Sequence, residues 1–139
     1  MKRISALALL IIASLSTATL ALCQEGGLKA KIPFDFTVGD TWMPAGEYVV
    51  SSPFRLVIQL RKTDGSAITS VVTKASNHES DSGNELVFNK YGDRYFLHRV
   101  LCPATKAMNV DVTNGKAEKR ERSLEAGLRG PEETLVAAK

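Results

Sequence analysis

Residues 28 to 38 alternate between apolar and polar side chains. The apolar members of this pattern are Leu28, Ala30, Ile32, Phe34, Phe36 and Val38. A period of two predicts one half-buried strand, in which Asp35 points outward as a solvated or turn-bonding acid. Because Pro33 cannot donate a ladder hydrogen bond, the strand must be unpaired or at a sheet edge there. The segment Met43–Gly46 then predicts a tight turn.

Further short strands follow this turn. Residues 47–52 form one candidate strand, which Pro53 is expected to interrupt, and residues 55–61 form the next. The dipeptide Asp-Gly at positions 64–65 is the strongest short hairpin signal in the chain. It leads into residues 67–74, which are rich in Val, Ile and Thr, as strands are.

The clearest hairpin is predicted between Glu85 and Leu101, after a polar loop at residues 75–84 that has no periodicity. Its turn is Gly-Asp at positions 92–93, and glycine in the first place of a two-residue loop suits a type II′ turn. This register places Phe88 opposite Leu97. Both faces of the hairpin are half apolar, so the hairpin is expected to be central in the sheet.

The pattern weakens after Pro103. Residues 108–112 are a short strand candidate, and residues 116–127 consist of good helix formers that stop at Gly127. The apolar stripe of this charged helix is thin, so the helix is expected to be mostly solvated and weakly docked. Residues 134–138 are a last strand or a one-turn helix, with the strand favoured. Together the elements predict an all-β, mainly antiparallel fold: a small β-sandwich or barrel of about six to eight strands with one C-terminal helix.

The N-terminal residues differ in character from this domain. Met1-Lys2-Arg3 is a basic start, and Ile4–Leu22 is an apolar run with Ser and Thr, which is typical of a secretory signal peptide. Cleavage after Ala21 would remove residues 1–21 and leave a single β-rich domain at 22–139, exported to the periplasm or the extracellular space. An N-terminal transmembrane anchor is the alternative. After cleavage, no remaining segment is apolar enough to span a membrane.

The charge balance narrows the range of expected partners. Loss of Lys2 and Arg3 would bring the number of basic residues, which is 18, close to the number of acidic residues, which is 15, so nothing in the charge balance favours nucleic acid.

The two cysteines are Cys23 and Cys102. In an oxidising compartment they could form a disulfide, and a free buried Cys102 is the alternative. Cys23 also ends the tetrapeptide Leu-Ala-Leu-Cys, which resembles a lipoprotein signal, although a residue as large as leucine is unusual before the lipidated cysteine.

Catalytic and metal-binding patterns are absent from the sequence. The two histidines, His78 and His98, lack the paired spacing of a zinc site, and no cofactor is expected. The sequence contains no Gly-x-Ser-x-Gly motif and no Cys-x-x-Cys pair. The acidic loop at residues 79–85 carries oxygen ligands but lacks the spacing of a calcium-binding EF-hand loop. The sequence therefore predicts a protein that is not an enzyme.

One surface is a candidate for binding. The predicted hairpin "NKYGDRYFLHRV" places aromatic residues beside basic ones, as surfaces that stack on bases or sugars do. The candidate residues are Tyr91, Arg94, Tyr95 and Phe96. The alternative is that aromatic and basic side chains simply occupy the two sides of a hairpin. For an exported chain the expected partners are an envelope protein or a glycan.

Three phrases carry a family resemblance: "IPFDFTVGDTWMPAGEYVV", "LVFNKYGDRYFL" and "KAEKR". They resemble a group of small exported bacterial proteins of unknown function with the motifs IPFxFxVG, PAGxY and NxYGDxYFL. The resemblance implies export and a β fold, and it brings no activity and no catalytic residues. Trp42 and Met43 stand where smaller or more ordinary aliphatic residues are expected, and Cys102 lies outside the pattern.

The combined expectation is an exported, non-enzymatic β-domain that acts by binding or structural association in the cell envelope. A small-ligand carrier with an apolar pocket inside a barrel is the first alternative. A hydrolase with an unrecognised site is the second.

Overall fold

The computed structural model describes residues 27–103, 108–125 and 131–139. Within these ranges the chain forms ten strands and one helix. They are β1 (Leu28–Ile32), β2 (Phe36–Val38), β3 (Thr41–Met43), β4 (Gly46–Phe54), β5 (Val57–Lys62), β6 (Ile68–Ala75), β7 (Glu85–Tyr91), β8 (Arg94–Leu101), β9 (Val110–Val112), α2 (Lys116–Glu125) and β10 (Glu132–Ala137). The predicted fold class is confirmed, with more strands than expected. The segment 134–138, for which a strand was favoured, lies mainly in β10.

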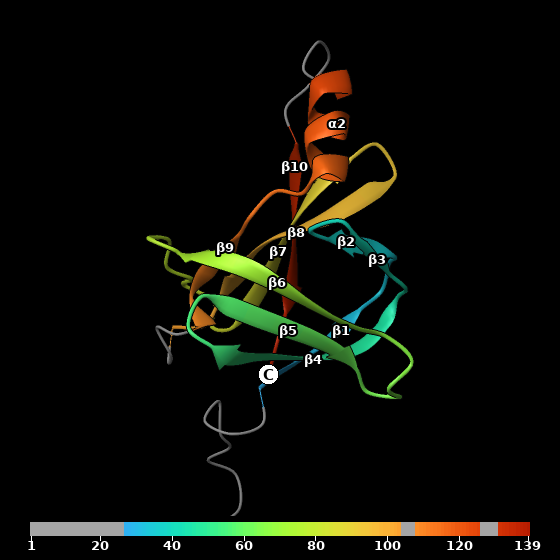
Figure 1. The fold of residues 1–139 in the computed structure, drawn as a ribbon. Helices are drawn as coiled ribbons and strands as arrows, with labels where there is room; N and C mark the ends of the chain where they lie inside the picture. The colour runs from blue at the N-terminus through green and yellow to red at the C-terminus, as the bar shows by residue number, and fades with distance from the viewer. Residues whose placement is uncertain (1–26, 104–107, 126–130) are drawn as a thin grey trace, which may run out of the picture.

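The strands pair in the order β1-β4-β5-β6-β9-β8-β2-β3, and β7 lies between β8 and β10. All pairs are antiparallel except β2 with β8, which meet in parallel at Thr37 and Phe96. Strand β6 pairs with β5 through residues 68–72 and with β9 through residues 73–75, so it joins the two parts of the sheet. Figure 1 shows β4, β5 and β6 crossing the lower part of the molecule, while β7, β8 and β10 rise toward α2. The sheet does not form a closed barrel, although an isolated bridge links Ala138 to Ala30.

The alternating segment at residues 28–38 forms two strands, so the prediction of one continuous strand is wrong. The ladder stops at Ile32 and resumes at Phe36. Strand β1 pairs with β4, whereas β2 pairs with β3 and β8. Pro33, which lacks a backbone donor, starts the interruption, and the chain changes partners across it.

The expected interruption at Pro53 is also wrong. Strand β4 continues through Pro53 to Phe54, and its register against β5 shifts between Ser51 and Phe54. A proline is tolerated at such a bulge because the ladder is already irregular there. The turn that follows contains Leu56 at a φ of 60°. Because β4 and β5 pair in antiparallel fashion, residues 46–62 form a hairpin that the sequence patterns did not indicate.

The predicted hairpin at residues 85–101 is confirmed. Phe88 lies opposite Leu97 as expected, and Gly92 takes a φ of 59° in the turn. One register shift occurs between Val87 and Phe88. Strand β7 is flanked by β8 and β10, and β8 contacts β7, β9 and β2, so the hairpin is central as predicted.

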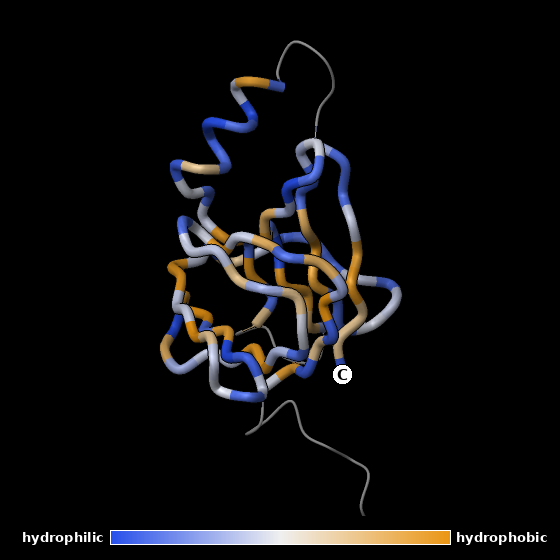
Figure 2. Tube along the Cα trace, turned by 90° about the vertical axis from the view of Figure 1, so that its right-hand side faces the viewer, coloured by the Kyte–Doolittle hydropathy of each residue, from blue (hydrophilic) through white to orange (hydrophobic). Residues whose placement is uncertain are grey.

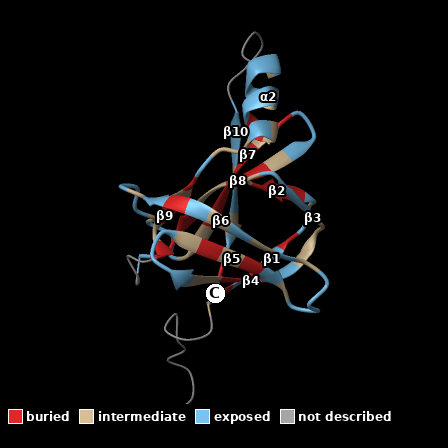
Figure 3. Ribbon diagram, viewed as in Figure 1, coloured by how far each residue is buried: buried red, intermediate tan, exposed pale blue. Residues whose placement is uncertain are grey.

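An apolar cluster of buried side chains forms the core. Figure 3 shows in red the parts of the strands that carry buried residues. The largest members of the cluster come from both parts of the sheet. The Phe36 ring meets Tyr48 edge to face at 5.2 Å between centroids and meets Phe88 at 5.4 Å. All three side chains are less than 2% exposed. In contrast, α2 is mainly hydrophilic along its length (Figure 2).

Candidate functional site

Helix α2 docks through a carboxylate. Glu118, in the first helical turn, is 2% exposed, whereas Leu124 is 68% exposed. The expectation that the charged run forms a solvated face is therefore wrong at Glu118, and the apolar stripe does not provide the main contact. Burial of a charged group is costly unless hydrogen bonds compensate for the lost hydration, so the partners of this carboxylate decide how the helix is held.

Two side chains of β7 supply these hydrogen bonds. The Asn89 Nδ2 group donates to Glu118 Oε1 at 3.0 Å, and the Tyr91 hydroxyl donates to the same oxygen at 3.4 Å. Asn89 and Tyr91 are two residues apart in one strand, so their side chains emerge on the same face of the sheet. Both are at least 95% buried. Burial raises the pKa of Tyr91, and the negative charge of Glu118 raises it further.

The turn between β2 and β3 caps the helix. Asp40 Oδ1 accepts a hydrogen bond from the backbone N–H of Ala117 at 3.2 Å, which satisfies one of the unpaired donors at the helix start. The approach is close: a Cβ atom placed on Gly115 would lie 2.2 Å from the carbonyl oxygen of Gly39. A side chain at position 115 would therefore separate the helix from the turn.

A third contact lies further along the helix, where Arg94 of β8 donates to Glu121. We call Asp40, Asn89, Tyr91, Arg94, Glu118 and Glu121 the helix-docking cluster. It joins three segments that are distant in sequence. These contacts attach α2 to the sheet, and the buried carboxylate of Glu118 is covered by the helix that carries it. Among the described residues, no group of three or more His, Cys, Asp and Glu side chains could hold a metal ion.

The four residues predicted as a binding surface have different environments. Tyr91 and Phe96 are buried, at 2% and 1% exposure, so neither presents an open ring for stacking. The Tyr95 ring stacks on Phe34 at 3.8 Å between centroids. Arg94 is exposed but paired with Glu121. The aromatic residues of the hairpin therefore contact mainly other parts of the fold. The sequence alone did not show that α2 would contact Tyr91 or that the Phe34 ring would stack on Tyr95.

Asp35, the acid between two phenylalanines, bonds a turn. Its Oδ1 accepts a hydrogen bond from the backbone N–H of Ala45 at 2.8 Å. The Tyr48 hydroxyl donates to the carbonyl oxygen of Pro44 in the same turn. This is the turn-bonding role expected for Asp35. It ties the segment between β1 and β2 to the segment between β3 and β4.

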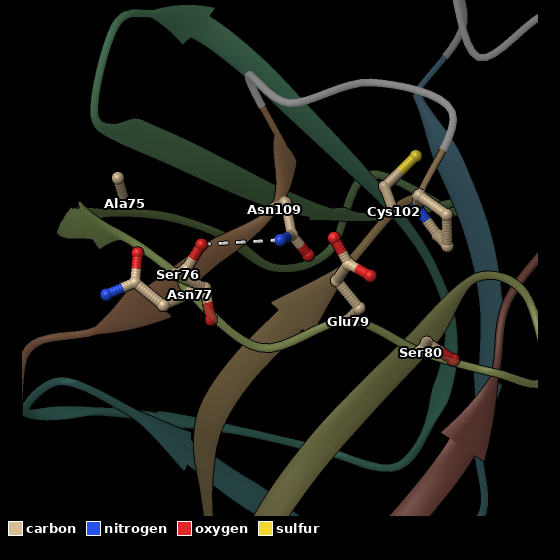
Figure 4. Close-up of a pocket in the computed structure, with 8 residues that line it drawn as sticks. Ala75, Ser76, Asn77, Glu79, Ser80, Cys102 and Asn109 are labelled. Atoms are coloured by element: carbon tan, nitrogen blue, oxygen red, sulfur yellow. Dashed lines mark hydrogen bonds between the residues drawn. The ribbon is translucent and has the colours of Figure 1, made fainter.

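A surface pocket of about 560 Å³ lies beside Cys102 (Figure 4). The loop after β6 lines the pocket with Ser76 and Glu79, and Asn109 lies beside Ser76, to whose carbonyl oxygen its amide donates a hydrogen bond at 3.4 Å. Asn109 Nδ2 donates to the backbone carbonyl of His78 at 2.8 Å, so this amide helps to hold the loop. Cys102 itself is fully buried.

Other predicted residues are placed away from any shared site. His98 is half-buried in β8, with Nε2 at 3.3 Å from Arg99 Nη2, and His78 is exposed in the loop. Cys23 lies outside the described residues, so its disulfide with Cys102 and its lipidation stay predictions. The described helix is too short and too polar to cross a membrane.

Comparison with known proteins adds no assignment. No protein-family model, no curated protein and no solved structure matches the chain.

Proposed function

We propose that this chain is an exported, non-enzymatic β-domain that acts by association with a partner in the cell envelope. The basic start and the apolar run Ile4–Leu22 support export, as does the resemblance to small exported bacterial proteins of unknown function. The observation that carries the proposal is an exposed tryptophan on an edge strand of a fold whose interior is filled.

Trp42 is 62% exposed in β3, and β3 pairs with β2 alone in the described strand order. Trp42 lies opposite Thr37, which in turn pairs with Phe96, so the indole emerges on the same face as that ring. An exposed tryptophan is costly to leave in water and is enriched where proteins bind partners. An unpaired strand edge also offers backbone groups to an incoming chain. The indole and the edge together form a compact surface for a protein or a glycan.

The interior of the fold argues against a carrier. Tyr48, Phe36 and Phe88 fill the space between the strands, where a ligand would have to lie in a barrel-type carrier. The 560 Å³ pocket lies at the margin of this core, beside Cys102, and has polar loop residues in its wall.

A hydrolase is also disfavoured, because the buried carboxylate of Glu118 is covered by its own helix and engaged by Asn89 and Tyr91. A substrate would have to displace α2 to reach it. Association through an exposed surface requires no such opening.

Site-specific photocrosslinking in cells tests the proposal. A photoreactive phenylalanine analogue replaces Trp42 in one variant and Ser70, an exposed residue of β6, in a matched control. We expect an adduct of discrete mass in the envelope fraction from the Trp42 variant and none from the Ser70 variant. Equal labelling at both sites, or none, would refute association through β3. Recovery of the chain in the cytosol with its first 21 residues intact would refute export.

A further inference from the structure

The turn between β4 and β5 projects apolar side chains into solvent. Phe54 is 74% exposed, and Pro53 and Leu56 beside it are also exposed. Phe54 lies opposite Val57, and Val57 lies opposite Val72, so these three side chains share the outer face of the sheet. Val72 is 64% exposed. We call Pro53, Phe54, Leu56 and Val72 the tip patch.

This turn contains a leucine in a strained backbone conformation. Leu56 has a φ of 60°, a left-handed conformation that glycine or asparagine adopts at much lower cost. Its side chain is 38% exposed, and it is absent from the buried core cluster. Folding alone therefore does not account for leucine at this position. Strain of this kind, held at an exposed position, is a reason to look for a binding role.

The chain enters the fold at the same end of the sheet. Leu28 lies opposite Val50 in the antiparallel pair of β1 and β4, and β4 runs on from there toward Phe54. Gly27 packs directly on this strand, since a Cβ atom on it would lie 2.4 Å from the carbonyl oxygen of Val50. At strand rise, Val50 and Phe54 are about 14 Å apart. The tip patch is thus close to the point where the chain leaves the described fold.

An apolar run precedes that point by a few residues. The run Ile4–Leu22 ends beside Cys23, and four residues separate Cys23 from Leu28. Even when fully extended, the five steps from Cys23 to Leu28 span at most about 18 Å. If the run lies in a bilayer, or if Cys23 carries a lipid, this short connection keeps the tip-patch end of the domain near the lipid surface.

The charges around the tip patch suit a lipid headgroup layer. Arg55 lies within the turn, and Lys74 follows Val72 on the same face of β6; both are exposed. Aromatic and aliphatic side chains flanked by cations are the composition that enters the interface of a bilayer. The nearby loop also carries Glu79 and Asp81, so electrostatic attraction to anionic lipid is limited. Apolar contact must therefore supply most of the binding.

We propose that the tip patch contacts the lipid surface of the membrane to which the N-terminal segment holds the domain. The inference rests on the envelope location proposed above and on an attachment that outlasts export, either a lipid on Cys23 or the uncleaved apolar run. It is independent of the partner surface at Trp42.

Quenching by brominated lipid tests this contact in the full chain. The variant Phe54→Trp is prepared in a Trp42→Phe background, so that it carries a single indole. Ile68→Trp in the same background is the matched control, because Ile68 is also exposed on the outer face but lies at the opposite end of β6. Each chain is reconstituted into phosphatidylcholine vesicles with and without brominated acyl chains, and co-flotation is measured separately.

We expect all chains to float with the vesicles and only the indole at position 54 to shift to the blue and to be quenched. Flotation without quenching at position 54 would overturn the tip contact and leave the envelope location standing. Equal quenching at positions 54 and 68, or no flotation, would also overturn it. A blue shift at position 54 without quenching would assign the tip to contact between copies of the chain. Repetition with phosphatidylglycerol vesicles is expected to change the quenching little.

Discussion

Removal of the Glu118 carboxylate is the sharpest test of how α2 is held. Glu118→Ala leaves the Asn89 amide and the Tyr91 hydroxyl buried without their shared acceptor. An unsatisfied buried polar group costs about 1–3 kcal/mol, so two such groups predict a loss of about 3 kcal/mol in the free energy of unfolding. Glu118→Gln keeps an acceptor of the same shape and loses the charge, which predicts a loss of about 1 kcal/mol.

Urea denaturation followed by far-ultraviolet circular dichroism measures these losses. Arg120→Ala is the matched control, because Arg120 lies on the exposed side of the same helix. Its effect is expected to stay within about 0.5 kcal/mol. The double variant Glu118→Ala with Asn89→Ala should cost less than the sum of the two single variants, with a coupling of about 1–2 kcal/mol, since both remove the same contact.

The reasoning fails if Glu118→Ala costs no more than Arg120→Ala, or if the two variants at positions 118 and 89 are additive. Additivity would mean that the two side chains stabilise the domain independently, in spite of the 3.0 Å separation between Nδ2 and Oε1. The losses in the two Glu118 variants are compared after the effect of Arg120→Ala has been subtracted. If Glu118→Gln then costs as much as Glu118→Ala, the charge, and not the acceptor geometry, holds the helix.

Three other results are expected. Asp40→Ala, which removes the cap on the Ala117 N–H, should lower the free energy of unfolding by about 1 kcal/mol, and Asp40→Asn should restore most of it in the same urea assay. Leu56→Gly should raise the free energy of unfolding by up to about 1 kcal/mol by relieving the positive φ, while it weakens contact of the tip with vesicles; a destabilised variant would show that the leucine packs in the fold. Because the folded pKa of Tyr91 lies above its ordinary value of 10.0, the folded state keeps this proton longer, so stability should fall as the pH rises above 10.0. Tyr48 has a raised pKa as well, so Tyr91→Phe should reduce this fall without abolishing it, and an unchanged pH profile would contradict the role of Tyr91.

The strands were predictable where local signals agreed. In the β7–β8 hairpin, alternation and the Gly-Asp turn both give the same register, and Phe88 does lie opposite Leu97. At Pro33 the missing donor indicated lost pairing, but nothing local indicated that the strand would change partners. At Pro53 the same residue type failed to end a strand, because a bulge accommodates it.

The helix contact was not predictable from hydropathy. A stripe analysis assigns Glu118 to the solvated face, since an isolated carboxylate is seldom buried. The partners that reverse this preference lie in β7, 29 and 27 positions away in the chain. One signal was present: Asn89 and Tyr91 place polar atoms two residues apart in a predicted central strand. Such atoms need a partner when buried, and Glu118 is an acceptor within the charged helix.

The same residues show what several polar side chains of the conspicuous motifs do within the fold. The acid of "IPFDF" bonds the "PAG" turn, and the aspartate of "VGD" caps α2. The Asn and Tyr of "NKYGD" hold the glutamate of "KAEKR". Each of these motifs therefore has at least one polar side chain that is engaged in a contact within the fold. Side chains available to a partner are those that take no part in such intramolecular contacts. Trp42, Phe54 and Leu56 are exposed at positions where they add little to the stability of the fold. A binding function should therefore be sought at these three residues, and substitutions in the motifs should act first on stability.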